Sequence, residues 1–595
     1  GIEGDLPRKV VIERLLGPRP RGAWITERVW EQNLASLLVG SGYEYATLDD
    51  SHFAHAGLDP AALGPCYRAE DDGRLLTVFP ASERLRYLIP FGTVEEVIAE
   101  LRSHLPEEGL ALVVYADDGE KFGLWPGTHK HVYEDGWLAR YHAALLAEGD
   151  WLEPVTLSTA FDRVRPEGLA YLGDDSYREM TEWVLPAEAQ ADFLDAAKQL
   201  EGDPRFERLR RFFRGGSWRA FKAKYSELRR LYARMLAISA EVDSLPEKKA
   251  RRARRELYRA QCNCAWWHGV FGGVYMPHLR GAVWKHLLAA ERVAGGSGRR
   301  RRPAVERGDF DLDGREELRL NTPQLSAFLA PERGGHLFEL DYTPGDLSLT
   351  DVLTRRFEAY HLEIRKQLET GGGGGGSDGS VSIHDLQREA SAAHGDHLVY
   401  DPAPLESLVD RVIPGDWSVE ELWRAAPDCA QAFTSGECEL SVSRRSARAA
   451  MTLSGHVAGN GPLEVVKTVS LRGGRLEADY RLENRGGGEL DFTFGTEVNL
   501  SADFQPPDEG TPRGPEVLFY EDAGHLLSAC NPANICVRML APAAAAAAWQ
   551  VKTVSQSETS YEICVQGLAV FVWWYLRLAP GERAEKSLAL SVEDA

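Results

Sequence analysis

The sequence predicts an α/β part followed by a helical segment and a C-terminal β-sandwich. Apolar β-forming runs alternate with helix-like segments over residues 1–185, and apolar residues recur at three- and four-residue spacing over 186–293. Strands that alternate apolar and polar residues dominate 318–595. Strand–helix alternation is typical of a parallel sheet or barrel, and many alternating strands favour a sandwich. We expect the Gly- and Arg-rich residues 294–317 to be a linker with an acidic loop.

Composition narrows the functional classes. The 595 residues, 44% of them hydrophobic, are enough for several cores. A formal charge of −22 disfavours a nucleic-acid binder, and no apolar run approaches the roughly 18 residues that span a membrane. The eight cysteines are few and scattered, which does not indicate a secreted disulfide framework, so we expect a cytoplasmic protein. Nothing in the sequence indicates the oligomeric state.

The first expected strand, residues 23–26, ends directly before Glu27. Trp24 and Trp30 flank this carboxylate, and aromatic rings beside acids are surfaces on which sugar rings stack. The alternative for this stretch alone is an ordinary acidic residue at a helix N-terminus.

A second strand–helix unit places further polar residues at the same expected edge. A helix over residues 32–39 precedes a strand over 43–48, which is followed by Asp50 and His52. Because the carboxyl ends of parallel strands meet at one edge, we expect these side chains to lie on one rim with Glu27.

Acids also follow a later apolar run. We expect Asp118 and Glu120 to stand just past the carboxyl end of a strand over residues 110–115. The other elements expected before it are strands over 75–79 and 85–89 and a helix over 94–101. A retaining glycosidase needs two carboxyls about 5–5.5 Å apart. Taken alone, the triplet from Asp118 to Glu120 fits a catalytic acid, a metal site or a solvated turn.

The helical segment ends in a run rich in aromatic residues, CNCAWWHGVFGGVYMPHLR. Buried packing against the glycine pair is the ordinary interpretation of Trp267 and His268, and a saccharide platform is the alternative. Cys262 and Cys264 lack the spacing and the flanking histidines of a zinc site, so we interpret them as buried thiols.

The acidic loop has the pattern of a calcium loop. Asp309, Asp311 and Asp313 alternate as oxygen ligands, a glycine follows for the tight turn, and Glu317 supplies a carboxylate at the ninth position. We expect a structural calcium ion at the domain junction, with a plain acidic turn as the alternative.

Four ordered stretches carry a family resemblance. RGAWITERVWE, LDDSHF, YADDGEKFGLWPGTHKHVYEDGWL and AQCNCAWWHGVFGGVYMPHLR together resemble glycoside hydrolase family 57, in its 4-α-glucanotransferase and α-amylase-like branch. The resemblance covers residues 21–291, and the C-terminal part resembles the sandwich of that branch. It implies an incomplete seven-stranded (β/α) barrel, a helical segment and the sandwich.

The resemblance also implies roles for individual residues. Glu27 matches the nucleophile and Asp118 the general acid/base, while Glu120 matches a carboxylate of the same site. Trp267 and His268 fall in a motif associated with substrate binding. Trp218 occupies a similar aromatic position, and Trp24, Asp50 and His52 complete the expected substrate contacts. Cys264 stands where some members have an acid.

The resemblance implies a retaining 4-α-glucanotransferase acting on α-1,4-glucans or maltooligosaccharides, without a cofactor for catalysis. An α-amylase-type hydrolase is one alternative. Only some 20 residues precede the Glu27 motif, so we expect the first barrel strands, with their HQP-type motif, to be missing. The second alternative is therefore an inactive carbohydrate-binding fragment.

Overall fold

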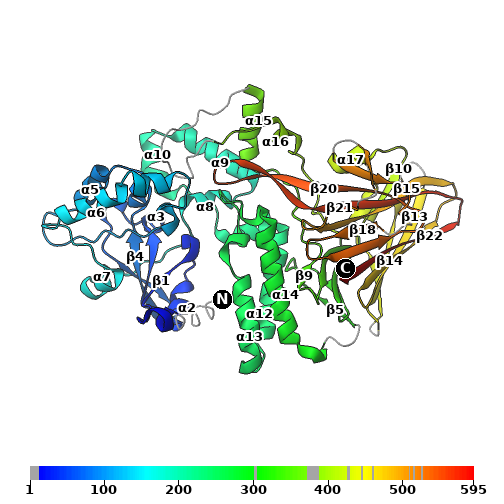
Figure 1. Ribbon diagram of the computed structural model, residues 1–595, viewed down its shortest axis with the longest axis horizontal. Coiled ribbons are helices and arrows are strands. Elements are labelled where there is room, and N and C mark those ends of the chain that lie inside the picture. Colours follow the sequence, from blue (N-terminus) through cyan, green and yellow to red (C-terminus); the bar gives the residue numbers. More distant parts are fainter. Residues whose placement is uncertain are drawn as a thin grey trace.

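The computed structural model describes residues 12–299, 304–370, 388–424, 429–443, 446–457, 461–507, 510–513, 516–523 and 527–594. Figure 1 shows an α/β part in blue at one end, helices in cyan and green at the centre, and β-sheets in yellow to red at the other end. The order of these parts agrees with the sequence prediction.

The α/β part is built on a four-stranded sheet with the order β1-β2-β4-β3. β1 (Gly22–Trp24), β2 (Tyr45–Asp49) and β4 (Arg74–Ala81) are parallel, and β3 (Tyr67–Asp71) pairs antiparallel with β4. Every residue of β2 is buried, as expected for a central strand. The carboxyl ends of the three parallel strands therefore meet at one edge, where Glu27 and Asp50 follow β1 and β2.

Two predicted strands of this part are wrong. Residues 85–89 lie mainly in helix α4 (Glu83–Leu88), because the Ser82 hydroxyl accepts the Leu85 N–H at 3.2 Å and caps a helix there. In the predicted strand 110–115 only Val114 pairs, through a single parallel bridge to Ala81. The segment still continues the parallel arrangement, and Asp118 still follows it.

The remaining helices of the α/β part are α2 (Leu34–Gly40), α3 (Asp50–His55), α5 (Val94–Ser103), α6 (Trp137–Ala147) and α7 (Leu157–Arg163). The helical segment consists of α8 (Arg178–Trp183), α9 (Ala187–Leu200), α10 (Pro204–Leu209), α11 (Phe221–Lys224), α12 (Ser226–Asp243), α13 (Glu247–Ala260) and α14 (Pro277–Arg299). α12, α13 and α14 pack together through a core that includes Leu231, Ile238, Leu257 and Leu287. Helices thus begin eight residues before the predicted boundary at 186.

The predicted linker 294–317 differs in the structure. Helix α14 continues to Arg299, and β5 (Ala304–Gly308) pairs antiparallel with β6 (Glu317–Asn321). β5 is the first strand of a five-stranded sheet with β6, β7 (Leu325–Ala330), β8 (His336–Tyr342) and β9 (Leu347–Ser348). Residues 300–303 lie outside the described part. The acidic loop therefore joins two paired strands.

Two antiparallel sheets form the C-terminal part. Their orders are β10-β15-β21-β20-β17-β16 and β11-β12-β13-β14-β22-β19-β18. The longest strands are β12 (Arg448–Val457), β13 (Gly461–Arg472), β14 (Arg475–Asn484), β15 (Leu490–Ser501), β20 (Ala545–Gln556), β21 (Tyr561–Leu578) and β22 (Arg583–Asp594). The shorter ones are β10 (Val409–Pro414), β11 (Glu439–Ser443), β16 (Thr511–Arg513), β17 (Val517–Tyr520), β18 (Leu527–Cys530) and β19 (Ile535–Leu540). Residues of both sheets share one apolar core, as in a sandwich. This part also contains α15 (Tyr360–Thr370), α16 (Ala392–Asp396), α17 (Val419–Arg424) and α18 (Gln431–Thr434).

Strand β20 is unusual because it begins in an alanine run. Ala546 and Ala548 lie in the large core between the sheets, whereas Ala547 and Trp549 lie in a second cluster with Phe571. Successive side chains of a strand point to opposite faces, so both faces of β20 are buried. The adjacent strand β21 supplies the large rings that the alanines accommodate.

Cysteine placement corrects two expectations. Cys530 and Cys536 form a disulfide across the β18–β19 hairpin, which the scattered cysteine positions did not predict. The other six are free thiols, and Cys262 and Cys264 are exposed rather than buried. No helix among the described residues is long and apolar enough to cross a membrane.

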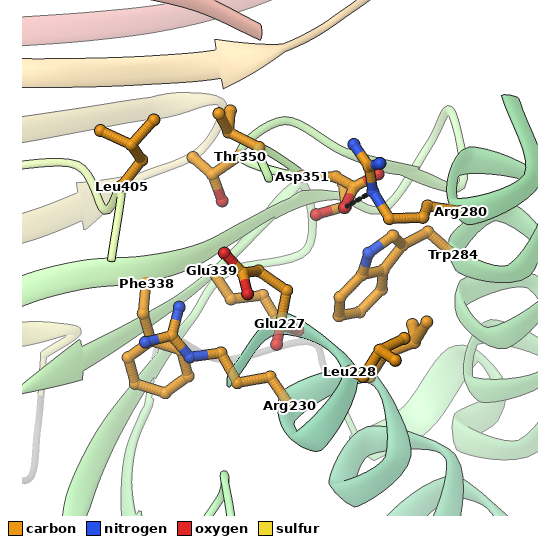
Figure 2. A pocket seen from close by; sticks show the side chains of 13 residues that line it. Glu227, Leu228, Arg230, Arg280, Trp284, Phe338, Glu339, Thr350, Asp351 and Leu405 are labelled. Carbon is orange, nitrogen blue, oxygen red and sulfur yellow. Dashed lines mark hydrogen bonds and ion pairs between the residues drawn. The ribbon is translucent and has the colours of Figure 1, made fainter. Parts of the chain in front are cut away.

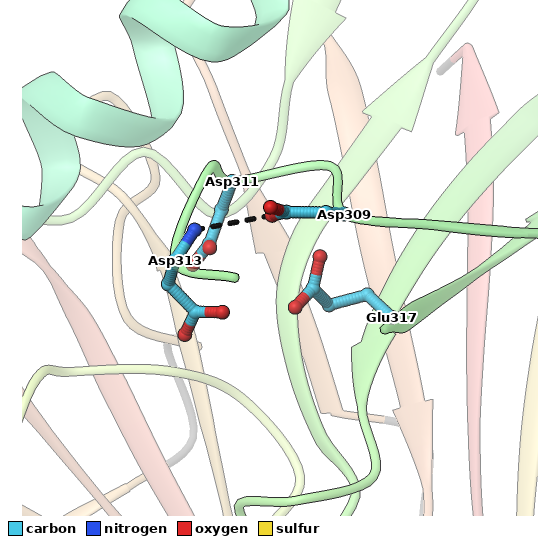
Figure 3. Close-up of side chains that lie close together, drawn as sticks. All are labelled: Asp309, Asp311, Asp313 and Glu317. Atoms are coloured by element: carbon cyan, nitrogen blue, oxygen red, sulfur yellow. Dashed lines mark hydrogen bonds between the residues drawn. The ribbon is translucent and has the colours of Figure 1, made fainter. Parts of the chain in front are cut away.

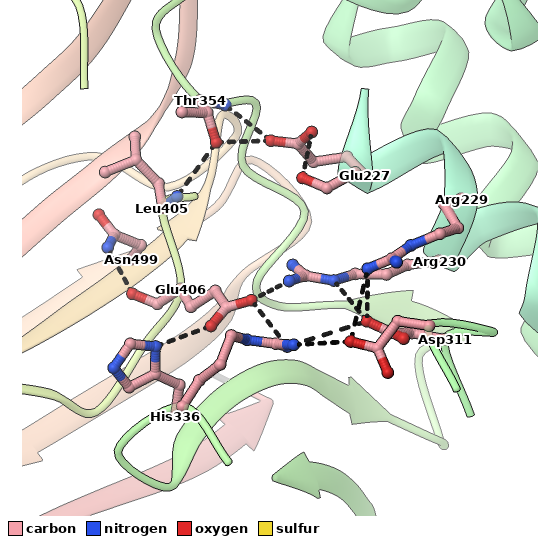
Figure 4. Close-up of polar contacts among 12 residues, drawn as sticks. Glu227, Arg229, Arg230, Asp311, His336, Thr354, Leu405, Glu406 and Asn499 are labelled. Carbon is pink, nitrogen blue, oxygen red and sulfur yellow. Dashed lines mark hydrogen bonds and ion pairs between the residues drawn. The ribbon is translucent and has the colours of Figure 1, made fainter. Parts of the chain in front are cut away.

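Polar and tightly packed contacts join the helices to the sheets. A cavity of about 20 Å³, room for about one water, lies between them, and at it the Arg280 Nε lies 3.1 Å from Asp351 Oδ1. Figure 2 shows the side chains that line this cavity. Figure 4 shows a neighbouring network in which Arg230 of α12 binds Glu406, which also contacts His336 Nδ1 at 2.8 Å. The two parts are therefore connected by buried charged groups.

Candidate active site

Glu27 stands at the carboxyl end of β1 in a strained backbone conformation. It lies within a short 3₁₀ turn, Thr26–Arg28, with φ of 53° and ψ of 17°. A left-handed conformation at a residue other than glycine costs about 1–3 kcal/mol and is concentrated at functional sites. The Ser176 hydroxyl donates a hydrogen bond to the Glu27 carbonyl, which helps to hold this conformation.

Contacts from distant parts of the chain fix the Glu27 carboxylate. The Asn263 amide donates from Nδ2 to Glu27 Oε1 at 2.8 Å, and Tyr177 forms a side-chain hydrogen bond with the same carboxylate. Tyr177 is buried, and burial and the Glu27 charge keep its pKa well above the ordinary value, so its hydroxyl stays protonated. One carboxylate is thus oriented by an amide and a phenol.

Several neighbouring groups shift the pKa of Glu27. Burial raises the pKa of Glu27, the Tyr177 hydrogen bond and the Arg28 charge lower it, and the Asp118 charge raises it again. The exposed thiol of Cys264 feels the same acids, because burial, Cys262, Glu27 and then Glu120 raise its pKa. Glu27 and the loop around Asn263 are therefore in contact, and the charges of Asp118 and Glu120 act on them.

A buried ion pair supports the turn that carries Asp118. Lys121 pairs with Asp117, and the Lys121 Nζ also donates to the Arg86 carbonyl at 2.7 Å. Asp117 Oδ1 accepts the Asp118 backbone N–H at 2.9 Å. Asp118 and Glu120 themselves are exposed. Asp117 and Lys121 hold the turn. Asp118 and Glu120 therefore remain accessible to a ligand.

Comparisons with known proteins find relatives over almost the whole chain. The chain is 35% identical to a 4-alpha-glucanotransferase of Thermococcus kodakarensis over 576 residues, 95% of this chain and 82% of that protein. It is 32% identical to alpha-amylase 1 of Dictyoglomus thermophilum over 583 residues, again 95% and 82%. The chain belongs to glycosyl hydrolase family 57.

Three family models match successive parts of the chain. The model described as glycosyl hydrolase family 57 matches residues 8–173, and models of the alpha-amylase/4-alpha-glucanotransferase middle domain and C-terminal domain match 216–294 and 309–530. The crystal structure of the 4-alpha-glucanotransferase of Thermococcus litoralis superposes with a TM-score of 0.84 at 31% identity, covering 98% of this chain and 84% of that one. The similarity to that crystal structure therefore includes the α/β part, the helices and the sheets of this family 57 chain.

In this family 57 chain, Trp24 is exposed to solvent. Asp50 and His52, which were predicted to lie on the same rim, are partly and fully buried. The Trp24 ring is 46% exposed, with the Arg28 guanidinium 5.6 Å from its centre. Burial, followed by the Glu83 and Asp49 charges, raises the pKa of the partly buried Asp50 to about 7. His52 is buried and its Nε2 contacts the Arg28 carbonyl at 2.9 Å, so it supports the backbone beside Glu27.

The aromatic residues near the end of the helical segment lie mainly in the core. Trp267 is 3% exposed and stacks on Trp183, with ring centres 5.7 Å apart and an angle of 8°. Trp218 is half-buried against the helical core. Both ring nitrogens of His268 have protein partners, the Gly272 carbonyl at 2.6 Å and the Tyr360 hydroxyl at 3.1 Å. This places Trp267 and His268 in packing, the ordinary interpretation, and does not support a saccharide platform.

Sequence reasoning missed Asn263 and Tyr177. Asn263 stands between the two cysteines that drew attention as possible zinc ligands, and Tyr177 follows a short acidic turn without periodicity. Their contacts with Glu27 join residues 236 and 150 positions apart, which only folding brings together. No spacing rule predicts such a contact, although the position of Asn263 inside a family motif was a usable signal.

The four acids of the predicted calcium loop come together in the structure. One carboxylate oxygen from each of Asp309, Asp311, Asp313 and Glu317 lies within 4.8 Å of the others, and Figure 3 shows the four side chains around one small space. Asp311 Oδ1 and Glu317 Oε1 are buried and lack a hydrogen-bond partner. Burial, with Asp311 and Asp313 nearby, raises the pKa of Glu317 to about 7. Carboxylate oxygens left unpaired in this way fit a hard cation.

Proposed function

We propose that this chain is a retaining 4-α-glucanotransferase acting on α-1,4-glucans or maltooligosaccharides. The observation that carries the proposal is the single site in which Glu27, held by Asn263, feels the charge of Asp118. Membership of family 57 and the printed names of the relatives support the substrate class. The alternative acceptor, water, would make the chain an α-amylase-type hydrolase, and relatives with that name also match.

The mechanism assigns a role to each carboxyl group. A Glu27 oxygen attacks the anomeric carbon while Asp118 gives its proton to the departing glycosidic oxygen, and a covalent glycosyl-enzyme forms. Asp118 then removes a proton from the 4-hydroxyl of an acceptor sugar, whose oxygen displaces Glu27. Asn263 and Tyr177 both hydrogen-bond the Glu27 carboxylate and orient it for this attack.

Incubation with maltotriose tests this function. We expect glucose together with oligosaccharides longer than maltotriose, and we expect Glu27→Gln and Asp118→Asn to lower the rate by about 10³-fold or more. Glu95→Gln, an exposed acid on α5, is the matched control. A folded preparation that releases neither glucose nor longer products would contradict the proposal.

We propose further that the parallel strands are part of an incomplete seven-stranded (β/α) barrel. The parallel pairing of β1, β2 and β4 and the parallel bridge from Ala81 to Val114 support a curved continuation of the sheet. Such an arrangement puts Glu27 and Asp50 at the carboxyl ends of β1 and β2, and Asp118 after the segment that follows β4 in the sheet, at the edge where barrel enzymes carry their chemistry.

A structural calcium ion at the acidic loop is also proposed. Asp309, Asp311, Asp313 and Glu317 would hold it, and it would neutralise carboxylates crowded beside β6. Asp311 Oδ2 already lies 3.1 Å from Arg229 Nη2 on helix α12, so an ion on this loop would stiffen the contact between helices and sheets. No catalytic step needs it.

Thermal unfolding with calcium and with a chelator tests the ion site. We expect calcium to raise the melting temperature, because an ion that binds only the folded state stabilises it. Asp309→Asn should abolish this rise, while Glu316→Gln, an exposed acid in the same loop, should keep it. An unchanged calcium-dependent rise in Asp309→Asn would reject the site.

A cytoplasmic location remains part of the proposal. The six free thiols support it, whereas the Cys530–Cys536 disulfide does not.

A further inference from the structure

Two of the eight cysteines differ from the others in their exposure. All eight lie in the described ranges, and among them Cys262 and Cys264 alone are exposed free thiols. The other six are disulfide-bonded, buried or partly buried: Cys66, Cys429, Cys438, Cys530, Cys536 and Cys564. Because a thiol has to be accessible to react, a reagent in solution reaches Cys262 and Cys264 first.

The residue between the two exposed thiols is Asn263, the donor that orients the Glu27 carboxylate. Its Nδ2 lies 2.8 Å from Glu27 Oε1, and it begins the 3₁₀ turn Asn263–Trp266 directly after Cys262. Burial raises the pKa of the Cys264 thiol, and the charges of Cys262 and Glu27 raise it further. The two thiols therefore lie beside each other and beside the contact with Glu27.

A disulfide between Cys262 and Cys264 is within reach of the turn itself. Residues two positions apart have Cα atoms no more than about 7 Å apart, and a 3₁₀ turn shortens this distance. A disulfide usually joins Cα atoms about 4.4–6.8 Å apart. No other helix or strand has to move for the two sulfur atoms to meet.

Closing this bond would disturb the contact between Asn263 and Glu27. The closed ring contains the N, Cα and C atoms of Asn263. Both thiols are free in this structure, so ring closure has to turn the residues on either side of Asn263 toward each other. N–H···O hydrogen bonds extend to about 3.2 Å, so a shift of roughly 0.5 Å removes the 2.8 Å contact with Glu27.

We propose that Cys262 and Cys264 are a reversible oxidation site, at which disulfide formation slows the reaction by withdrawing Asn263 from Glu27. The proposed oxidant is a low-molecular-weight disulfide. An excess of a reducing thiol would restore both protein thiols, because exposed disulfides are readily reduced. The effect on the reaction rests on the proposed function, whereas formation of the bond does not.

The bond forms in two thiol–disulfide exchange steps. The Cys262 thiolate attacks one sulfur of the small disulfide and releases one small thiol. The Cys264 thiolate then attacks the Cys262 sulfur and releases the second small thiol. Two protein thiols lose their protons and are oxidised to one disulfide, while the small disulfide is reduced to two thiols. The raised pKa of Cys264 leaves less of it ionised, which favours Cys262 for the first attack.

Treatment of the full chain with oxidised glutathione tests the bond. Trypsin cleaves after Arg259 and Arg280, and the peptide between these sites contains both cysteines and no other. We expect mass spectrometry to find this peptide lighter by two hydrogen atoms after oxidation, and at its reduced mass after dithiothreitol. A peptide that keeps both free thiols, or that carries glutathione without the internal bond, would overturn the proposal.

Steady-state kinetics with maltotriose test the effect on the reaction. We expect oxidation to lower kcat at least about tenfold with little change in KM, and dithiothreitol to restore it. Cys262→Ser should keep near-normal activity that oxidised glutathione does not lower. Wild type and this variant share the Cys530–Cys536 disulfide and Cys564, so an equal loss of activity in both would overturn the proposal.

Hydrogen–deuterium exchange separates failure of the oxidation site from failure of the proposed function. We expect oxidation to increase exchange in peptides that cover Thr26–Arg28 in wild type and not in Cys262→Ser. That result supports the oxidation site even if maltotriose is not converted. Undiminished conversion of maltotriose by protein that carries the Cys262–Cys264 bond would overturn the oxidation site and leave the proposed function intact.

Discussion

The Glu27 carboxylate receives an amide hydrogen bond from a residue 236 positions away in the sequence. Together with the hydrogen bond from Tyr177, this contact from Asn263 orients the carboxylate. A donor to a carboxylate nucleophile fixes its angle of attack and stabilises the charge that returns to it when the sugar leaves.

Asn263→Ala should therefore lower kcat by about 10- to 100-fold with little change in KM, because the lost contact positions a reacting group. Steady-state kinetics with maltotriose measure this. Cys262→Ser, a change in the adjacent exposed residue, should keep near-normal activity. An unaltered kcat in Asn263→Ala would remove the positioning role.

Sequence reasoning at this scale rested on acids that follow apolar runs. Glu27 follows β1 as expected, whereas Asp118 follows a segment that pairs only at Val114. His52, Trp267 and His268 show the limit of such reasoning. Burial decides whether a polar or aromatic side chain meets a ligand or the core, and a turn without periodicity does not indicate which side faces inward.

At the scale of elements, the segment that leads into α15 carries a buried carboxylate joining it to the helices. Glu358 lies 3.0 Å from the Lys224 Nζ and accepts hydrogen bonds from Tyr225 at 2.7 Å and Tyr275 at 2.9 Å. Burial alone would raise the pKa of Glu358, but the Lys224 and His268 charges and the hydrogen bonds lower it to about 2.

The Glu358 carboxylate makes the free energy of unfolding depend on pH. Its pKa in the folded state is below the ordinary 4.5, so the ionised group stabilises the fold by roughly 3 kcal/mol. This contribution is fully present above pH 4.5 and is lost as the pH falls toward 2. Urea unfolding at pH 7 and at pH 3.5 should show a smaller pH effect in Glu358→Gln than in wild type. An identical pH effect in both would contradict the assignment. Glu363→Gln on α15 is the control.

Helices and strands were predicted well where the apolar periodicity was strong. They were predicted poorly where a capping residue determined whether a helix or a strand formed. The long helices and the sandwich strands followed their patterns. Residues 85–89 are apolar enough for a strand, yet the Ser82 cap starts a helix in front of them. The predicted linker contains β5 because pairing with β6, a long-range contact, is not visible in local composition.

For the whole molecule, Arg234 connects three separated segments. Its Nε lies 2.7 Å from Glu339 Oε1, and its Nη2 lies 3.0 Å from Glu291 Oε2 and 3.5 Å from Asp341 Oδ2. The guanidinium is buried and lies 4.8 Å from the centre of the Phe328 ring. One cation from α12 thus pairs with Glu291 of α14 and with Glu339 and Asp341 of β8.

Arg234→Ala should lower the free energy of unfolding by about 3–5 kcal/mol, because it removes the counter-charge of the buried Glu339 and Asp341. Equilibrium urea unfolding measures this loss. Arg259→Ala, an exposed arginine paired with Glu256 on α13, should change stability by less than about 1 kcal/mol. Equal effects of the two substitutions would show that the buried network does not hold the helices to the sheets.

The alternating burial of the alanine run in β20 restricts how the number of residues in this run can change. Changes in chain length are usually tolerated in surface loops. Here Ala546 and Ala548 face one core while Ala547 and Trp549 face another, and a single inserted alanine would exchange these faces for every residue up to the next turn. Losses or gains of two alanines would preserve the alternation, so surviving length variants of this run should differ by even numbers.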